Sequence, residues 1–220
     1  MCARLFLSRL LAGAPHAILR TGAVLAACLA FLPAAPATAT EIDVDVELVL
    51  AVDISQSMDQ EEQQIQRDGY VAALLSEEVN DAIAEGINGK VAVTYVEWGG
   101  QSEQFVVAGW QLIDGPESAE RFARQLADAP LRTVQRTSIA AALTFAAGLF
   151  ENNGYRGLRR VIDISGDGPN NQGGLVTESR DAIVDRGIVI NGLPLMMNSG
   201  GAWYHLPNLD DYYEDCVIGG

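Results

Sequence analysis

Cysteine and histidine are scarce in this sequence. Its 220 residues contain three cysteines and two histidines, His16 and His205, and none of them has the spacing of a zinc site. Cys2 and Cys28 lie near the amino terminus, so Cys216 would stand alone if that segment were removed. A lone cysteine is more often a small buried apolar residue than a nucleophile. These features argue against a zinc site of Cys and His and against an intrachain disulfide in the mature chain.

Positive charge is also scarce. Lys90 is the only lysine, and 14 basic residues stand against 29 acidic ones, which gives a net charge of −15. Binding to nucleic acid requires a basic surface, so that class of function is excluded. The acidic balance is compatible with binding of cations or basic partners, although a generic acidic exported protein would share it.

No apolar run is long enough for a confident membrane span. The most apolar stretch, residues 22–32, follows three arginines and precedes a run of small residues. This pattern predicts that residues 1–39 are a signal peptide and that residues 40–220 form the mature domain, periplasmic or secreted from a bacterium. An uncleaved anchor and lipoprotein processing at Cys28 are the alternatives.

Strands and helices are predicted to alternate along the rest of the chain. Short apolar, β-branched runs predict strands at residues 46–52, 90–98, 103–113, 158–165 and 187–195. Helices are predicted at residues 59–85, 115–127, 138–150, 173–186 and 208–215; the first has apolar residues at spacings of three and four, and the second has proline near its start. This alternation is typical of an α/β, doubly wound fold with a mostly parallel sheet and helices on both faces. The short link before residues 103–113 favours an antiparallel edge strand there.

The strand expected at residues 46–52 leads directly into Asp53, Ser55 and Ser57. Its near-continuous apolar run fits a parallel strand that is covered on both faces. The three oxygen-bearing side chains would then lie at the carboxyl end of that strand, where open α/β folds bind ligands. Their hard oxygen atoms suit magnesium, manganese or calcium better than zinc or copper. Alternatively, these residues only form the turn and cap the next helix.

This Asp-x-Ser-x-Ser pattern after a first strand resembles the metal-ion-dependent adhesion site of von Willebrand factor type A domains. The family adds a threonine from a second loop, which Thr137 matches at a helix entrance, and an aspartate from a third loop, which Asp167 matches after a strand. Gly166 stands where the family usually has threonine. The chain looks most like exported bacterial members of unknown function. We expect it to lack the family's final strand and helix, which would leave one edge of the sheet uncovered.

The resemblance implies a role for each matched residue. Ser55, Ser57 and Thr137 would contact a divalent ion directly. Asp53 and Asp167 would act through water or hydrogen bonds. The ion, Mg²⁺ or alternatively Mn²⁺ or Ca²⁺, would keep an open position that a carboxylate of a protein partner fills. The implied function is cation-dependent protein binding of the adhesion type and not catalysis.

Two other functions stay open at this point. An aspartate after the first strand can be the nucleophile of a magnesium-dependent phosphoryl-transfer enzyme. Haloacid-dehalogenase-like phosphatases, however, have a second aspartate where this chain has Ser55, and Lys90 begins a strand and does not match their later lysine. Neither a Gly-x-Ser-x-Gly elbow nor a P-loop is present. The remaining alternative is a metal-free scaffold domain with a vestigial site.

The sequence places three further charged residues in or near these loops. Arg132 and Arg136 flank the loop before the helix at residues 138–150 and are expected to be solvated or to neighbour the acids of the site. Asp163 lies inside a predicted strand and is a weaker candidate, as a polar neighbour.

Overall fold

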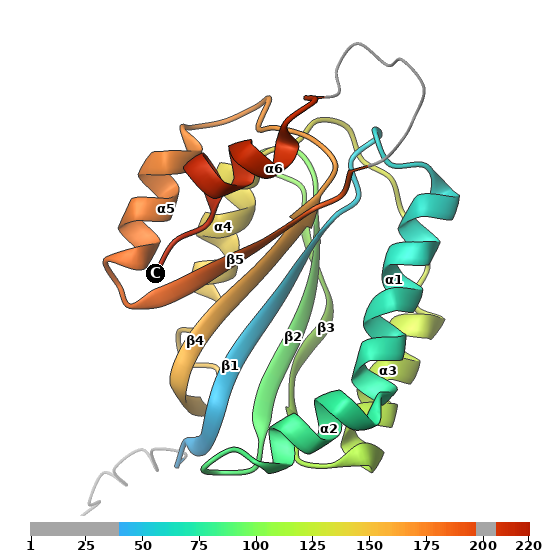
Figure 1. The fold of residues 1–220 in the computed structure, drawn as a ribbon, viewed down its shortest axis with the longest axis vertical. Helices are drawn as coiled ribbons and strands as arrows, with labels where there is room; N and C mark the ends of the chain where they lie inside the picture. Colours follow the sequence, from blue (N-terminus) through green and yellow to red (C-terminus); the bar gives the residue numbers. More distant parts are fainter. Residues whose placement is uncertain (1–39, 197–205) are drawn as a thin grey trace, which may run out of the picture. The chain divides into compact units, whose positions relative to one another are not determined.

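The computed structural model describes residues 40–196 and 206–220. In this part of the chain, five strands form one sheet in the order β3-β2-β1-β4-β5 (Figure 1). They are β1 (Ile42–Asp53), β2 (Val91–Trp98), β3 (Gln104–Ile113), β4 (Tyr155–Gly166) and β5 (Ile188–Pro194). β1 pairs in parallel with β2 and β4, β4 pairs in parallel with β5, and β3 runs antiparallel at one edge. The predicted mostly parallel sheet with an antiparallel edge strand is confirmed.

β1 lies in the middle of the sheet because its side chains are apolar on both faces. Val49 and Ala51 belong to the core on one side, and Leu50 and Val52 belong to the core on the other. This division follows the two-residue period of a strand. All four side chains are buried, as expected for a parallel strand that is covered on both faces.

Helices cover both faces of the sheet (Figure 1). One face carries α1 (Gln60–Leu75) and α3 (Pro116–Asp128), with α2 (Glu77–Ala84) next to α1. The other face carries α4 (Ile139–Gly148), α5 (Val176–Val184), α6 (Leu209–Tyr212) and the π-helical turn η1 (Tyr213–Val217). The predicted doubly wound α/β architecture is therefore confirmed.

The prediction of a single helix over residues 59–85 is wrong, because the structure has two helices there, α1 and α2. Ser76 has an extended backbone, which ends α1, and its hydroxyl accepts a hydrogen bond from the Val79 amide at 3.2 Å in the first turn of α2. Serine followed by acidic residues is a favourable helix start. Because serine is also tolerated inside helices, the spacing of apolar residues could not reveal this break.

The carboxyl-terminal segment returns to the edge strand β5. Gly219 and Ile190 form an antiparallel bridge, in which the Ile190 amide donates to the Gly219 carbonyl at 2.8 Å and the Gly219 amide donates to the Ile190 carbonyl at 3.1 Å. The edge expected to be uncovered is therefore paired at this position. The helix predicted at residues 208–215 is present as α6, which continues into η1.

Within residues 40–196 and 206–220, no helix is both long and apolar enough to cross a membrane. The signal peptide expected at residues 1–39 lies outside the described residues, so its assignment stays a prediction.

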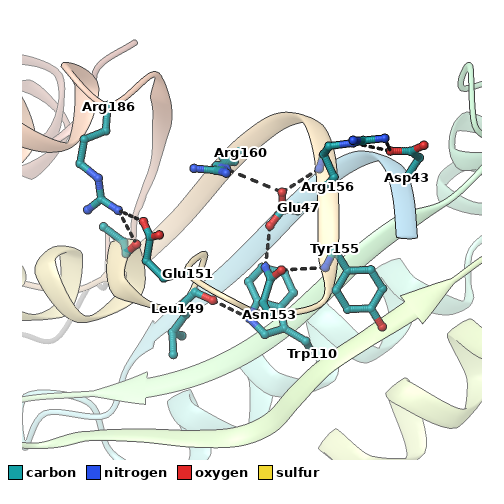
Figure 2. A network of polar contacts seen from close by, with 12 residues as sticks. Asp43, Glu47, Trp110, Leu149, Glu151, Asn153, Tyr155, Arg156, Arg160 and Arg186 are labelled. Atoms are coloured by element: carbon teal, nitrogen blue, oxygen red, sulfur yellow. Dashed lines mark hydrogen bonds and ion pairs between the residues drawn. The ribbon is translucent and has the colours of Figure 1, made fainter. Parts of the chain in front are cut away.

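The one acid inside the first predicted strand, Glu47, is fully buried, and it belongs to the network of polar contacts in Figure 2. The Asn153 side-chain amide donates to its carboxylate at 2.5 Å, the Gly157 backbone amide donates at 2.7 Å, and the Arg160 guanidinium lies 3.7 Å away. These contacts fasten the start of β4 to β1. Glu47 therefore has a structural role, about 20 Å along the strand from Asp53 at a rise of about 3.3 Å per residue.

Candidate metal centre

The site is built where β1 and β4 end side by side. Asp53 is the last residue of β1, and Asp167 directly follows the last residue of β4. The two strands are parallel neighbours, with Val52 paired to Ser165. Parallel neighbours have their carboxyl ends at the same edge of the sheet, so this pairing brings the two acids together from distant parts of the sequence.

Four of the five predicted site residues are linked by short hydrogen bonds. The hydroxyl oxygens of Ser55 and Ser57 are 2.9 Å apart. The Ser57 hydroxyl donates to Asp167 Oδ1 at 2.7 Å. The Ser55 backbone amide donates to Asp53 Oδ1 at 2.7 Å. The loop after β1 is thereby tied to the loop after β4 through the same oxygen atoms that the sequence suggested as ligands.

Thr137 comes from the segment before α4. This segment lies against the loop after β1 through a bridge between Val134 and Ser55. The Thr137 amide donates to Asn171 Oδ1 at 3.0 Å, and its carbonyl accepts from the Asn171 amide at 2.9 Å, which ties it to the loop after β4. Thr137 is buried and lines the same cleft as the two serine hydroxyls.

The three segments enclose a cleft of about 610 Å³. Its lining combines hydroxyl and carboxylate oxygens with one arginine; the residues are Ser55, Gln56, Ser57, Arg136, Thr137, Asp167, Gly168, Pro169 and Asn171. Of the two arginines expected near this loop, Arg136 lines the cleft, whereas Arg132 lies over the Phe105 ring, 5.0 Å from its centroid. Arg136 has φ 69°, a left-handed conformation that is strained for an arginine.

Asp53 is buried beside a second acid. Burial raises the pKa of Asp53 to about 8, with a further contribution from the charge of Asp167, while contacts with Ser55 and with the Asp167 backbone lower it in part. Asp53 Oδ2 has no well-formed hydrogen bond to any described residue. Two neighbouring carboxylates withdrawn from water repel each other, and a bound cation would relieve both the repulsion and the loss of hydration.

The chemistry of the donor set fits a hard divalent ion. In the part of the chain that the structure describes, no three side chains of His, Cys, Asp or Glu gather to hold a metal. Asp167 lines the cleft and Asp53 is buried behind it, so the remaining ligands would have to be the hydroxyls of Ser55, Ser57 and Thr137. A set made only of oxygen atoms suits Mg²⁺, Mn²⁺ or Ca²⁺.

Some residues at the site were not predicted from the sequence. Asn171 holds Thr137, and Asn170 Oδ1 accepts a hydrogen bond from the Ala140 amide at 3.2 Å in the first turn of α4. The signal available for them was the asparagine pair in the loop after β4, because asparagine often binds backbone groups in turns. Asp163 does not line the cleft, and it accepts a hydrogen bond from Asn191 at 2.7 Å.

Tyr213 was also missed as a neighbour of the site. It comes from η1, and its side chain is almost completely buried. Burial raises the pKa of the Tyr213 hydroxyl well above its usual value, and the nearby charges of Asp53 and Asp167 act in the same direction. No local pattern marks this tyrosine as a site residue, because its approach depends on how the carboxyl-terminal segment folds back over β5.

The order of the strands, the helices on both faces and the loops at one edge define a von Willebrand factor type A-like α/β domain. Proximal thread matrix protein 1 (PTMP1) from the mussel byssus, in a structure with a zinc-occupied MIDAS motif, matches with a TM-score of 0.56 and 16% identity over 69% of this chain and 38% of the mussel chain. The pilus adhesin SpaC from Lactobacillus rhamnosus GG matches with a TM-score of 0.56 and 13% identity over 82% of this chain and 28% of SpaC. These two likenesses show the fold.

BatB, a conserved hypothetical protein from Bacteroides thetaiotaomicron, matches with a TM-score of 0.51 and 25% identity over 71% of this chain and 69% of BatB. The chain belongs to the family described as "Protein of unknown function (DUF1194)", which it matches over residues 43–220. A comparison with curated proteins found no match.

Proposed function

We propose that this protein is an exported domain that binds an acidic group of a protein partner through a divalent cation. The ion would be held by Asp53, Ser55, Ser57, Thr137 and Asp167. The observation that carries the proposal is the hydrogen-bonded chain from Ser55 through Ser57 to Asp167, which gathers oxygen atoms from two loops. Neighbouring ligands of a Mg²⁺ octahedron with bonds of about 2.1 Å lie about 3 Å apart. The distances of 2.9 and 2.7 Å along this chain are close to that spacing.

The balance of charge at the site supports capture of an anion. Ser55, Ser57 and Thr137 are neutral, so the ion would keep much of its positive charge and an open position for a further ligand. The zinc in the MIDAS motif of the mussel protein supports a divalent ion at this place in the fold. The oxygen ligands of the present chain favour Mg²⁺, with Mn²⁺ and Ca²⁺ as the other choices.

Arg136 supports an acidic partner. It lines the cleft, and among the ion pairs of the described residues none involves it. A carboxylate that enters the cleft could therefore meet both the ion and the guanidinium group. The chain as a whole carries a net charge of −15 and would repel an acidic partner. These local cations would be needed to overcome that repulsion.

Metal binding is tested by thermal unfolding of the purified protein during titration with Mg²⁺, Mn²⁺, Ca²⁺ and Zn²⁺. An ion that binds only the folded state stabilises it by about 2.7 kcal/mol at 100 times its Kd. We expect such a rise for the parent and none for the double variant Asp53→Ala, Ser55→Ala. Asp163→Asn is the matched control, because Asp163 lies on β4 outside the cleft and should leave the rise unchanged. A flat response of the parent would support the metal-free scaffold instead.

Partner capture is tested by a pull-down from the exported fraction with and without a chelator. We expect Arg136→Glu to weaken capture by about tenfold or more while Mg²⁺ binding persists, because an attractive charge becomes a repulsive one. Arg132→Glu is the control, since Arg132 lies over Phe105. Turnover of a simple phosphate ester that disappears in Asp53→Asn would contradict the proposal and favour a phosphoryl-transfer enzyme.

The export part of the proposal depends on residues 1–39 and is tested separately. We expect amino-terminal sequencing of the protein recovered from the periplasm or the medium to begin near residue 40. Recovery of the full-length chain with the membrane fraction would instead support an uncleaved anchor.

A further inference from the structure

Two buried oxygen atoms, the Tyr213 hydroxyl and Asp53 Oδ2, lie close together on the inner side of the site. Tyr213 has 1% of its surface exposed and Asp53 has none. Neither the Tyr213 hydroxyl nor Asp53 Oδ2 has a well-formed hydrogen bond to a described residue. A buried hydroxyl without a hydrogen-bond partner is costly, so the position of the Tyr213 hydroxyl beside this buried carboxylate calls for an explanation.

Two glycines make the space that Tyr213 occupies. A Cβ atom at Gly166 would lie 2.8 Å from the Tyr213 hydroxyl oxygen and 2.9 Å from Asp53 Oδ2. A Cβ atom at Gly192 would lie 2.6 Å from Tyr213 Cδ1. Gly166 is on β4 and Gly192 is on β5, and the register Ile164 with Gly192 puts the two glycines on the same face of the sheet. The tyrosine therefore lies across the ends of two strands, and its hydroxyl approaches Asp53.

The position of Tyr213 is fixed by the turn that carries it. The Ile218 amide donates to the Tyr213 carbonyl at 3.0 Å, which closes η1. The Arg180 side chain of α5 donates to the Asp215 carbonyl at 2.8 Å, so η1 is attached to a neighbouring helix. In Figure 1, α6 and the red carboxyl-terminal segment lie on the same side of the sheet as α4 and α5. The tyrosine is thus held by elements that do not themselves line the cleft.

We propose that Tyr213 is a positioning residue for Asp53: its hydroxyl donates a hydrogen bond to Asp53 Oδ2, directly or through one trapped water. Because Oδ1 accepts the Ser55 amide at 2.7 Å, this second bond would fix the orientation of the whole carboxylate. The inference rests on the proposed function, in which Asp53 helps to hold the ion. Residues that orient the groups around a metal affect affinity without touching it, commonly by 10- to 100-fold.

The test compares Tyr213→Phe with the parent in two measurements. Calorimetric titration with Mg²⁺ should show a Kd weakened by about tenfold. Thermal unfolding in EDTA should show a single transition with a moderately lower midpoint, because Phe keeps the ring but removes the hydrogen bond to Asp53. Tyr95→Phe is the control: Tyr95 is equally buried in the core on the other face of the sheet, and its loss of a hydroxyl should leave the Kd unchanged.

The two proposals fail in different ways. If the parent binds Mg²⁺ and Tyr213→Phe binds it equally well, the positioning role is wrong and the proposed function stands. If the parent does not bind a divalent ion, the proposed function is wrong. In that case a double-mutant cycle of Tyr213→Phe and Asp53→Ala in EDTA decides on the hydrogen bond: coupled effects on the unfolding midpoint support it, and additive effects overturn it.

Discussion

Replacing Asp53 by asparagine should stabilise the metal-free protein at neutral and alkaline pH. Burial, and then the charge of Asp167, raises the pKa of Asp53 in the folded state from 3.8 to about 8. Between these two values, the folded protein binds a proton that the unfolded chain has already lost. The contribution of this carboxyl group to stability is therefore complete below about pH 4 and is lost as the pH rises toward 8.

The size of the effect follows from the shift. One pKa unit corresponds to about 1.4 kcal/mol. The increase from 3.8 to about 8 therefore sets an upper limit of about 6 kcal/mol on the stability that is lost at alkaline pH. About 4 kcal/mol of it is already lost at pH 7. Asparagine has nearly the same shape and can still accept the Ser55 amide, but it carries no charge. The variant should therefore escape most of this loss.

The assay is urea unfolding of parent and Asp53→Asn in EDTA at a series of pH values from about 5 to 9. The pKa values of Glu97 and Asp163 are also raised by burial, but both groups are present in the two proteins, so the difference between the curves isolates Asp53. We expect the difference to grow with pH and to reverse when saturating Mg²⁺ is added to the parent at pH 8. A difference that stays constant from pH 5 to 8 would refute the argument from burial and repulsion.

Two further changes test the packing around the site. Arg67→Met should cost about 3–5 kcal/mol in urea unfolding, because it removes the counter-charge of Glu97, whose side chain is only 1% exposed. Arg121→Met is the control: it breaks an exposed ion pair and should cost less than about 1 kcal/mol. Gly166→Ala should cost about 1–3 kcal/mol and weaken Mg²⁺ binding in the same titration as above, because its Cβ atom would be forced against Tyr213 and Asp53. Gly109→Ala is its control, since a Cβ atom there meets nothing within 4 Å and Gly109 lies on β3 outside the cleft, and equal losses in the two variants would contradict the packing argument.

The fold was predictable because the hydrophobic pattern carries most of its information. β1 is apolar on both faces, so both faces of its sheet must be covered. The alternation of strands with helices indicates that helices cover them, as in a mostly parallel sheet. The break at Ser76 was not predictable, since the same serine and acids fit either a continuous helix or a new start. The pairing of Gly219 with Ile190 was not predictable either, because a single bridge between distant residues leaves no periodic signal.

Part of the candidate site could likewise be predicted from the sequence pattern, and part could not. Asp53, Ser55 and Ser57 stand at alternate positions of one short segment, and strand order alone brings Asp167 beside them. Thr137 could be assigned only through the family resemblance, because a threonine at a helix entrance is equally well explained as a cap. In the structure Ser138, and not Thr137, caps α4, since its side chain accepts the hydrogen bond from Ala141. This leaves the Thr137 side chain available to the cleft that it lines.

Gly166 stands where the resembled family usually has a threonine, and the structure of the site gives a reason for this difference. A Cβ atom at this position would lie 2.8 Å from the Tyr213 hydroxyl and 2.9 Å from Asp53 Oδ2. A side chain at residue 166 and the tyrosine at residue 213 would therefore compete for the same space. In this chain, glycine at residue 166 leaves that space to the Tyr213 hydroxyl, which comes from η1. It follows that a larger residue at 166 should be tolerated only together with a smaller one at 213.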